Sequence, residues 1–488
     1  MESVSFRFST TTILLGGSNP KCVSPFRLLQ DRGFLAFSPT NRRLVSSTNC
    51  SAKHDTETNN GADYPCMSPS TAYPVNTNNP PLPGSPNSSF PESASPEKAS
   101  AFSRGLLFDL GTAGSWDSRE VGSPVVKRFI SDEEERWYLW YYGNSGEKRN
   151  QTGNNLDSIG LAVSSNGVHW ERGSGPVESS GDAGMVMECC ADWWAFDTLS
   201  IRPSEVVVMS SSKVRASSAV YWLYYTGFFA EEPDGLKTDE PLNARTISGE
   251  NPERFALDHA NLDNNNARIF KSLPGLAISQ DGRHWARIEG EHHSGALFDV
   301  GSRGEWDALF IANPHVVVHQ TGDLRMYYHS MDGKTGEFGI GVARSRDGMK
   351  WLKLGKILGA GKGGYFDELG ATNACVVKLK TEGESKYLMA YEGVGADGSR
   401  SIGLAVSGDG LRNWSRITDE AVLKPSNGER WDNKEVGSPY LVQMDGDVDA
   451  WRLYYRGVGY DGRTGIGMAT SRGGQVPSFR RWTGFQLT

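Results

Sequence analysis

The sequence predicts an all-β fold, on three observations. The chain has 488 residues with 57 Gly, and aromatic residues make up 10% of it. Many Gly together with many Trp and Tyr favours short strands and tight turns over helical bundles. One set of signals also recurs five times, with Asn-Gly or Asp-Gly pairs between apolar runs. The net charge of −8 argues against a nucleic-acid surface, and no apolar stretch is long enough to predict a membrane span.

Residues 1–50 have the composition of an organelle transit peptide. They are rich in Ser and Thr, and their only acidic residues are Glu2 and Asp31. The Ser and Thr content favours import into the chloroplast stroma, with a tail of no targeting role as the alternative. Residues 51–100 are dominated by Asn, Pro, Ser and Thr, which bury too little apolar surface to offset ordering entropy. We expect a disordered linker there.

Four signals recur in the same order through residues 101–488. An aromatic-Asp pair comes first. A short run follows it, which includes a Pro in most of the repeats. An aromatic strand comes third, and a Gly-apolar strand, a turn and a Trp complete the repeat. The aromatic-Asp pair occurs at Trp116-Asp117, Phe196-Asp197, Trp306-Asp307, Phe366-Asp367 and Trp431-Asp432. The aromatic strand is predicted at 137–142, 221–225, 324–328, 387–391 and 451–455.

Each repeat predicts about four antiparallel strands. Two-residue hairpin turns are predicted at Asn166-Gly167, Asp281-Gly282, Asp347-Gly348 and Asp409-Gly410. The run 137–142 is largely apolar on both alternating faces, so it needs packing partners above and below. The blades of a propeller supply them. Residues 101–488 are therefore predicted to form a five-bladed β-propeller with about four antiparallel strands per blade.

Propeller topology predicts which loops share a face. The innermost strand of each blade starts at the rim where the second strand ends. Two long insertions, 144–158 and 228–273, both connect a second strand to a third, so they are expected to rise over this rim. Long loops on a rigid scaffold usually carry function, so we expect the site on this face.

Five blades of this pattern resemble the clan of arabinanases, β-xylosidases, levansucrases and invertases, over roughly residues 100–488. The resemblance implies glycosyl hydrolysis or transfer by acidic residues around a central channel. In the clan an acidic residue often precedes Pro early in the innermost strand. The matching positions here are Ser123-Pro124, Pro203-Ser204, Asn313-Pro314, Asn373-Ala374 and Ser438-Pro439. Ser and Asn can bond a sugar hydroxyl but cannot serve as a general acid.

Other acids are expected on the same rim. Glu120 and Glu435 share the run Glu-Val-Gly-Ser-Pro in the first and last blades, which become neighbours when the propeller closes. Glu392, at the end of a second strand, is the third catalytic candidate. The alternative is that the three Glu form salt bridges. Side chains expected to bind a sugar are Arg119, Ser123, Arg202, Asn313, His329, Asn373 and Arg456.

The five repeated Asp are expected to be structural and to cap the loop into the innermost strand by side-chain to backbone hydrogen bonds, with a cation-binding ring as the alternative. His315 and His319 face the same way on one strand and are expected to be buried. Cys189-Cys190 lacks the spacing of a zinc site. No metal or cofactor is therefore expected. Two functions remain open: a plastid enzyme that acts on or binds glycans, and a non-catalytic propeller that binds a glycan or a protein partner through this face.

Overall fold

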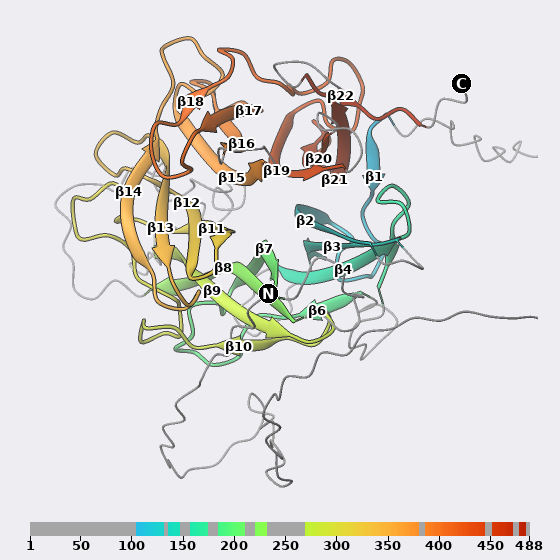
Figure 1. Cartoon of the computed structure of the whole chain (residues 1–488). Helices are drawn as coiled ribbons and strands as arrows, with labels where there is room; N and C mark the ends of the chain where they lie inside the picture. Colours follow the sequence, from blue (N-terminus) through green and yellow to red (C-terminus); the bar gives the residue numbers. More distant parts are fainter. Residues whose placement is uncertain are drawn as a thin grey trace, which may run out of the picture. The chain divides into compact units, whose positions relative to one another are not determined.

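The computed structural model describes residues 104–130, 135–146, 157–173, 184–209, 220–231, 269–379, 386–444, 451–471 and 478–484. The predicted transit peptide (1–50) and linker (51–100) lie outside these ranges, as do 147–156 and 232–268 of the two insertions. The described part is all-β, with 22 strands and no helix among its residues (Figure 1). It accordingly contains no helix that is long and apolar enough to cross a membrane.

Each predicted repeat forms a group of antiparallel strands that pair in chain order. The first repeat holds β2 (Glu120–Ile130), β3 (Glu135–Asn144), β4 (Ser158–Ser164) and β5 (Glu171–Arg172), with β6 (Met185–Met187) also on β4. The second holds β7 (Ser200–Val208), β8 (Tyr221–Glu231), β9 (Ile269–Ser279) and β10 (Ala286–Ile288). The third holds β11 (Ala312–Gln320), β12 (Asp323–Met331), β13 (Phe338–Ser345) and β14 (Leu352–Leu358).

The last two repeats follow the same order. The fourth holds β15 (Gly370–Leu379), β16 (Lys386–Val394), β17 (Arg400–Ser407) and β18 (Ser415–Arg416). The fifth holds β19 (Glu435–Gln443), β20 (Trp451–Val458), β21 (Thr464–Ser471) and β22 (Arg480–Arg481). Strand β1 (Leu106–Phe108), from the start of the described chain, pairs with β21. One parallel pair, Phe338 with Gly370, joins the third and fourth repeats into one sheet, so the described residues form four sheets.

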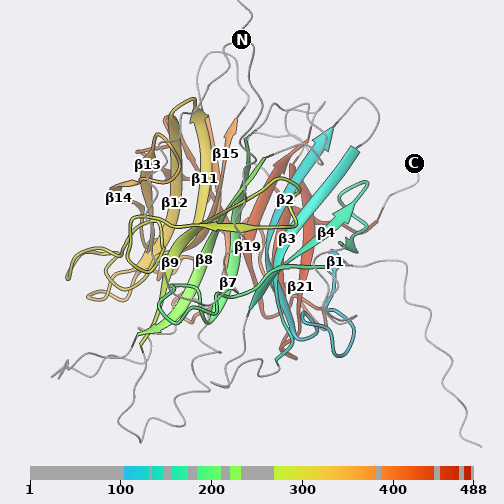
Figure 2. The ribbon, with the colours of Figure 1, turned by 90° about the horizontal axis from the view of Figure 1, so that it is seen from below.

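The first strands of the five repeats lie nearest the centre of Figure 1, and β10, β14, β18 and β22 lie at the periphery. Each first strand contacts that of the next repeat, in the order β2, β7, β11, β15 and β19, and β19 contacts β2. Figure 2, at right angles, shows the strands of the repeats running side by side. We call these five the central strands.

The aromatic second strands form the core of each repeat, as predicted. In β3, Trp137, Trp140 and Tyr141 are fully buried, so both faces of the strand are covered. The ring of the aromatic-Asp pair stacks on a Tyr of this strand, with 5.5 Å between the ring centroids of Trp116 and Tyr141. Gly160 on β4 leaves room for this ring, because a Cβ there would lie 2.5 Å from Trp116. The Gly-apolar signal therefore marks where the third strand passes an aromatic ring.

The repeated Asp residues are buried and structural, as predicted, but their partners are side chains rather than backbone N–H groups. In the first repeat, Asp117 accepts hydrogen bonds from Tyr141 (2.9 Å) and Arg172 (2.8 Å). The same Tyr and cation bond the Asp in every repeat: Tyr225 and Arg287, Tyr328 and Lys353, Tyr391 and Arg416, and Tyr455 and Arg481. Each Asp thus ties its own second and fourth strands together.

The prediction of two-residue hairpin turns is wrong. Six residues separate β9 from β10, and among Asp281 and Gly282 only Gly282 has a positive φ (75°). The Ser279 hydroxyl accepts the Gly282 N–H (2.8 Å), and Asp281 accepts the N–H groups of Arg283 and His284. Side chains that satisfy the backbone make a wider turn stable. The turns at Asn166, Asp347 and Asp409 repeat these contacts.

These turns also join neighbouring repeats. Trp140 of the first repeat donates to the Gly282 carbonyl of the second (2.9 Å), and Tyr224 donates to Gly348 of the third (3.1 Å). Tyr327 donates to Gly410 of the fourth, and Tyr454 of the fifth donates to Gly167 of the first. The last of these bonds links the two ends of the repeat series.

Candidate functional site

All five central strands border one cavity at the rim where they start, which is the face that the sequence predicted. Its accessible volume is about 10 Å³. Ser123, Asn313, Asn373 and Ser438 line it, with His315, Cys375 and Tyr440 from the following residues of three strands. A volume of roughly 10–15 Å³ holds one water-sized group. This cavity therefore admits one small polar group at a time.

Four lining residues adopt a left-handed backbone conformation that is uncommon for residues other than Gly. The φ values are 45° for Ser123 and Ser438, 50° for Asn313 and 47° for Asn373. Each lies at a break in the pairing register of its strand, so we call the four the bulge residues. A sparsely populated conformation costs on the order of 1–3 kcal/mol, and such residues cluster at functional sites. Four around one cavity therefore mark a candidate binding site.

The second strands carry a junction residue at one equivalent position, paired with Gly122, Arg202, Ala312, Thr372 and Gly437 of the central strands: Tyr142, Thr226, His329, Glu392 and Arg456. Three of them accept the backbone N–H of the next repeat's bulge residue. Thr226 accepts Asn313 (2.8 Å), His329 accepts Asn373 (3.3 Å) and Glu392 accepts Ser438 (2.8 Å). Two predicted site residues, His329 and Glu392, thus hold neighbouring repeats together.

Glu392 is a buried, hydrogen-bonded carboxylate. It forms an ion pair with Arg400, and the Asn373 amide donates to its other oxygen (2.9 Å). Burial alone would raise the pKa of Glu392, but Arg400, Asn373 and the Ser438 N–H lower it overall. A general acid needs its proton near neutral pH, so its pKa must move the other way. These contacts favour the salt-bridge alternative for this residue.

His329 is buried beside this carboxylate and uncharged. Burial lowers the pKa of His329 to about 3, although Glu392 partly opposes the shift. Its Nδ1 accepts the Asn373 N–H, so Nε2 carries the proton of the neutral ring. Nε2 is buried and has no hydrogen-bond partner among the described residues.

Arg456 sits among the three predicted catalytic carboxylates. It donates to Glu120 (3.2 Å), and the Tyr142 hydroxyl donates to the same oxygen (2.6 Å). Burial alone would lower the pKa of Arg456, but four nearby groups raise it: Tyr142, Glu120, Glu435 and Glu392. Of the three Glu, Glu120 thus pairs directly with Arg456, and these two side chains each remain 17% exposed.

The run Glu-Val-Gly-Ser-Pro, shared by the first and fifth repeats, has a steric explanation. A Cβ on Gly437 would lie 2.1 Å from the Glu392 carboxylate, and one on Gly122 would lie 2.7 Å from Arg456 Cδ. Gly therefore makes room for the two largest charged junction residues.

Arg202 is fixed between aromatic rings rather than extended into the cavity. Its guanidinium lies 4.5 Å from the Tyr142 ring centroid and 5.2 Å from that of Phe228. Its Nε donates to buried Asp157 (3.0 Å), which also accepts from Asn144. These contacts join the first and second repeats.

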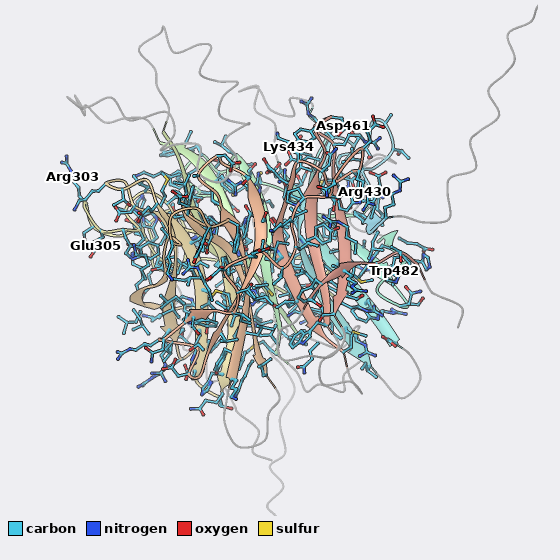
Figure 3. All side chains as sticks on the ribbon, turned by 90° about the horizontal axis from the view of Figure 1, so that it is seen from above. Arg303, Glu305, Arg430, Lys434, Asp461 and Trp482 are labelled. Carbon is cyan, nitrogen blue, oxygen red and sulfur yellow. The ribbon has the colours of Figure 1, made fainter. Side chains whose placement is uncertain are left out.

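The predicted cation Arg119 is exposed just before β2, and its backbone N–H donates to the Asn144 carbonyl (2.9 Å). Lys434 likewise lies just before β19, and its backbone N–H donates to the Val458 carbonyl (2.9 Å). Figure 3 shows Lys434 gathered with Arg430 and Asp461 at one end of the fifth repeat. Both cations thus lie at the rim, as expected.

Sequence reasoning missed the charged floor of the cavity. Glu205, one residue beyond the cavity-lining Ser204, is buried and forms an ion pair with Lys127. Tyr440 donates to it (3.1 Å), and His315 Nδ1 lies 2.8 Å away, close but not aligned as a hydrogen bond. Burial alone would raise the pKa of Glu205, but Lys127 and His315 lower it to about 2.

One signal could have revealed this floor. A lone Glu stands in β7 between Ser204 and an apolar Val run, at the position that Val125, His315, Cys375 and Tyr440 hold in the other repeats. His315 is buried, as predicted, and its Nε2 lies 3.0 Å from the Val376 carbonyl. Glu205 therefore links central strands of several repeats.

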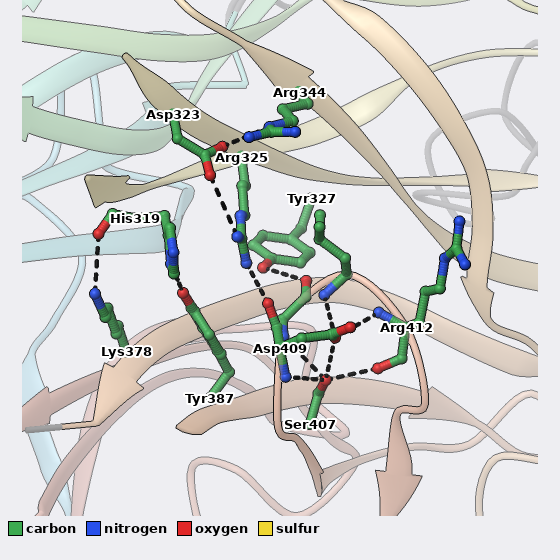
Figure 4. Close-up of polar contacts among 12 residues, drawn as sticks. His319, Asp323, Arg325, Tyr327, Arg344, Lys378, Tyr387, Ser407, Asp409 and Arg412 are labelled. Carbon is green, nitrogen blue, oxygen red and sulfur yellow. Dashed lines mark hydrogen bonds and ion pairs between the residues drawn. The ribbon is translucent and has the colours of Figure 1, made fainter. Parts of the chain in front are cut away.

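The opposite rim carries a second polar cluster, which Figure 4 shows. His319 is half-buried rather than buried, and it contacts the Tyr387 hydroxyl. Arg325 spans from Asp323 (3.3 Å) to the turn at Asp409, joining the third and fourth repeats. Burial, together with Arg325, Lys378 and Arg344, lowers the pKa of His319. This cluster ties turns to strands away from the cavity.

No protein-family model matches the chain, and no curated protein matches it. The solved structures that resemble it include a complex of BT0996 with RGII. That structure is 16% identical, with a TM-score of 0.49, over 78% of this chain and 95% of its own.

Two further similar structures are described as glycoside hydrolases. A thermostable family-43 glycoside hydrolase is 17% identical, with a TM-score of 0.48, over 75% of this chain and 95% of its own. A structure from a study of the GH130 family of mannoside phosphorylases is 14% identical, with a TM-score of 0.46, over 78% of this chain and 96% of its own. At these values the likeness assigns neither a family nor an activity to this chain.

Proposed function

We propose that the five repeats are the blades of a five-bladed β-propeller and that the cavity is the mouth of its central channel. The closed order of contacts among the central strands supports this interpretation. The bonds from four of the five aromatic strands to the turn of the next repeat support it as well.

We propose further that this propeller binds a glycan at the channel mouth without hydrolysing it. The observation that carries this proposal is the set of four bulge residues around one cavity. Hydroxyl and amide groups donate and accept at once, as sugar hydroxyls do. The accessible volume of about 10 Å³ admits one hydroxyl-sized group, so the rest of the sugar lies outside the cavity.

Binding is favoured over catalysis because the acids are held in charge networks. Glycoside hydrolysis needs one carboxylic acid that keeps its proton and a second carboxylate opposite it. Glu392 has a lowered pKa, and Glu120 accepts two hydrogen bonds. Hydrolysis by Glu120 and Glu435 is the second candidate, since both lie at the partly exposed rim.

The test is a glycan array and a panel of aryl glycosides, probed with the full chain. We expect binding without turnover, and Asn313→Ala should weaken it about tenfold or more, as loss of one to two good hydrogen bonds implies. Asn413→Ala is the matched control, because Asn413 has nearly the same φ (52°) but lies in a turn at the other end of the strands.

Turnover that Glu120→Gln or Glu435→Gln abolishes would show instead that the protein is an enzyme. Absence of glycan binding, with capture of a protein by the same face, would favour the protein-partner alternative.

We also propose import into the chloroplast stroma with loss of residues 1–50. The Ser-rich, acid-poor composition of this segment supports it. A fluorescent reporter fused to residues 1–60 should enter plastids, and a reporter that stays in the cytosol or is secreted would contradict this.

A further inference from the structure

One turn of the second repeat differs from its counterparts in the other repeats. Just before the aromatic-Asp pair of four repeats, a backbone N–H donates to the carbonyl three residues earlier and closes a β-turn. In three of these turns the two central residues are Ala113-Gly114, Arg303-Gly304 and Gly363-Gly364. In the second repeat the Ala195 N–H donates to the Asp192 carbonyl (3.0 Å), and the central residues are Trp193 and Trp194. Since the same turn forms elsewhere without a large apolar side chain, the fold does not require this Trp pair.

Both Trp side chains are open to solvent. Trp193 is 90% exposed, more than any other large apolar side chain among the described residues, and Trp194 is 42% exposed. Trp194 lies beside the loop that follows β10, where a Cβ on Gly295 would come within 3.8 Å of its ring. Trp is highly buried on average and is enriched at protein interfaces, so this exposed pair indicates an interaction surface.

Backbone bonds hold this turn in place. The Cys190 N–H donates to the Asp197 carbonyl (3.0 Å), and the Phe196 N–H donates to the Ser294 carbonyl of the loop that follows β10 (3.3 Å). The Phe196 ring also stacks on Tyr225, with 5.7 Å between the ring centroids. A turn that is already ordered loses little conformational entropy when a partner binds.

Acidic residues accompany the Trp pair. The segments 188–192 and 287–299 contain Arg287 as their only Lys or Arg, and they contain five acids, none of them buried: Glu188, Asp192, Glu289, Glu291 and Asp299. Arg287 already donates to the Asp197 carboxylate (2.8 Å) and to the Glu188 carbonyl. Lys350 of the third repeat pairs with Glu291 (2.8 Å). An excess of negative charge therefore lies beside the two rings.

We propose that this Trp turn binds a basic segment of a partner protein, with Arg or Lys side chains stacked on the faces of Trp193 and Trp194. Among aromatic side chains Trp attracts a cation most strongly, and the nearby acids add a Coulomb attraction. The same acids repel anionic lipid and nucleic acid. The residues that line the cavity do not belong to this turn, so the proposal does not depend on glycan binding.

The experiment measures binding of the full chain to short fluorescent peptides in which Arg alternates with Gly, and to peptides with Lys, Gln or Glu in place of Arg. The Arg peptide should bind most tightly, and the Glu peptide should not bind. Trp193→Ala should weaken binding of the Arg peptide about threefold to fivefold, and replacement of both Trp by Ala should weaken it about tenfold or more. Trp193→Leu keeps an apolar side chain without an aromatic face, so it should lose as much as Trp193→Ala, and Trp193→Phe should lose less.

Tyr460→Ala is the matched control, because Tyr460 is another exposed aromatic residue (77%) and follows β20 of the fifth repeat. It should bind the peptides as the wild type does, and thermal melting should show all variants folded. Glycan binding at the cavity should persist in Trp193→Ala, so the two proposals can fail separately.

The proposal is overturned if the wild type binds neither the Arg nor the Lys peptide, if the Trp variants bind them normally, or if the Gln peptide binds equally tightly. Full binding by Trp193→Leu would show an apolar contact in place of cation stacking. A dimer in sedimentation, or binding to phosphatidylcholine vesicles, that Trp193→Ala abolishes while peptide binding is unchanged would assign the turn to a second copy or to a membrane instead.

Discussion

At the scale of single residues, buried charge decides which groups are available for chemistry. Glu205 shows this most clearly, since it is buried with Lys127, His315 and Tyr440 as its partners. Removing one member of a buried charge cluster leaves the others without compensation, which costs far more than losing a surface ion pair. The Glu205 cluster on the cavity floor is thus structural, and the proposed ligand recognition falls to the bulge residues.

We therefore expect Glu205→Gln to lower the free energy of unfolding by about 3–5 kcal/mol at pH 7, measured by chemical denaturation. Glu420→Gln is the control, because Glu420 is 82% exposed and pairs only with Lys424 at the surface. It should change stability by less than about 0.5 kcal/mol. Equal effects of the two substitutions would show that the floor cluster does not stabilise the fold.

His329 predicts a distinct pH dependence. Its pKa is about 3 in the folded chain, against an ordinary value of 6.5, so the unfolded chain takes up a proton first as the pH falls. Stability from this residue is complete above about pH 6.5 and declines below it, with a slope approaching about 1.4 kcal/mol per pH unit. His329→Gln keeps an acceptor for Asn373 without titrating, so its stability should depend less on pH between 6 and 4. Exposed His169→Gln should retain the wild-type profile, and a His329→Gln profile that matches it would contradict this account.

At the scale of strands, contacts within and between the repeats explain why the repeated sequence signals occur. The aromatic strand, the aromatic-Asp pair and the Gly-apolar strand were each predicted correctly, because periodicity and repetition report burial directly. Turn geometry was not, since Ser279 and Asp281 satisfy the backbone in a way that an Asp-Gly pair alone does not reveal. The close packing of Arg456 against Gly122 could not be predicted either, because these residues lie more than three hundred positions apart in the sequence.

The simplest junction offers a direct measurement. Thr226→Val keeps the side-chain shape but removes the acceptor of the Asn313 N–H, so unfolding free energy should fall by about 1–3 kcal/mol. Thr226→Ser keeps the oxygen and should lose less. If the two variants prove equally stable in urea denaturation, the hydrogen bond between repeats contributes nothing measurable.

At the scale of the whole molecule, the two ends of the described chain meet in one sheet. Strand β1 pairs with β21 through Leu106 and Phe108, and the Gly105 carbonyl accepts the Met468 N–H (2.9 Å). The fifth repeat is thus built from both ends of the chain. The four signals of the sequence analysis did not include this segment, although residues 105–117 (GLLFDLGTAGSWD) closely resemble residues 295–307 (GALFDVGSRGEWD).

We therefore expect that the start of the chain matters for folding only from about residue 104 onward. Residues 101–488 should melt like the full chain, since removal of 1–100 leaves β1 and its partner intact. Residues 111–488 should melt at lower temperature and aggregate, because the loss of β1 exposes the edge of β21. Phe108→Ala in the full chain isolates the packing contribution: Phe108 is buried and Arg172 lies 4.4 Å from its ring, so we expect a loss of about 3–5 kcal/mol. Calorimetry of the three proteins beside the wild type decides the matter, and a cooperative, wild-type melt of residues 111–488 would show that β1 is dispensable for closure.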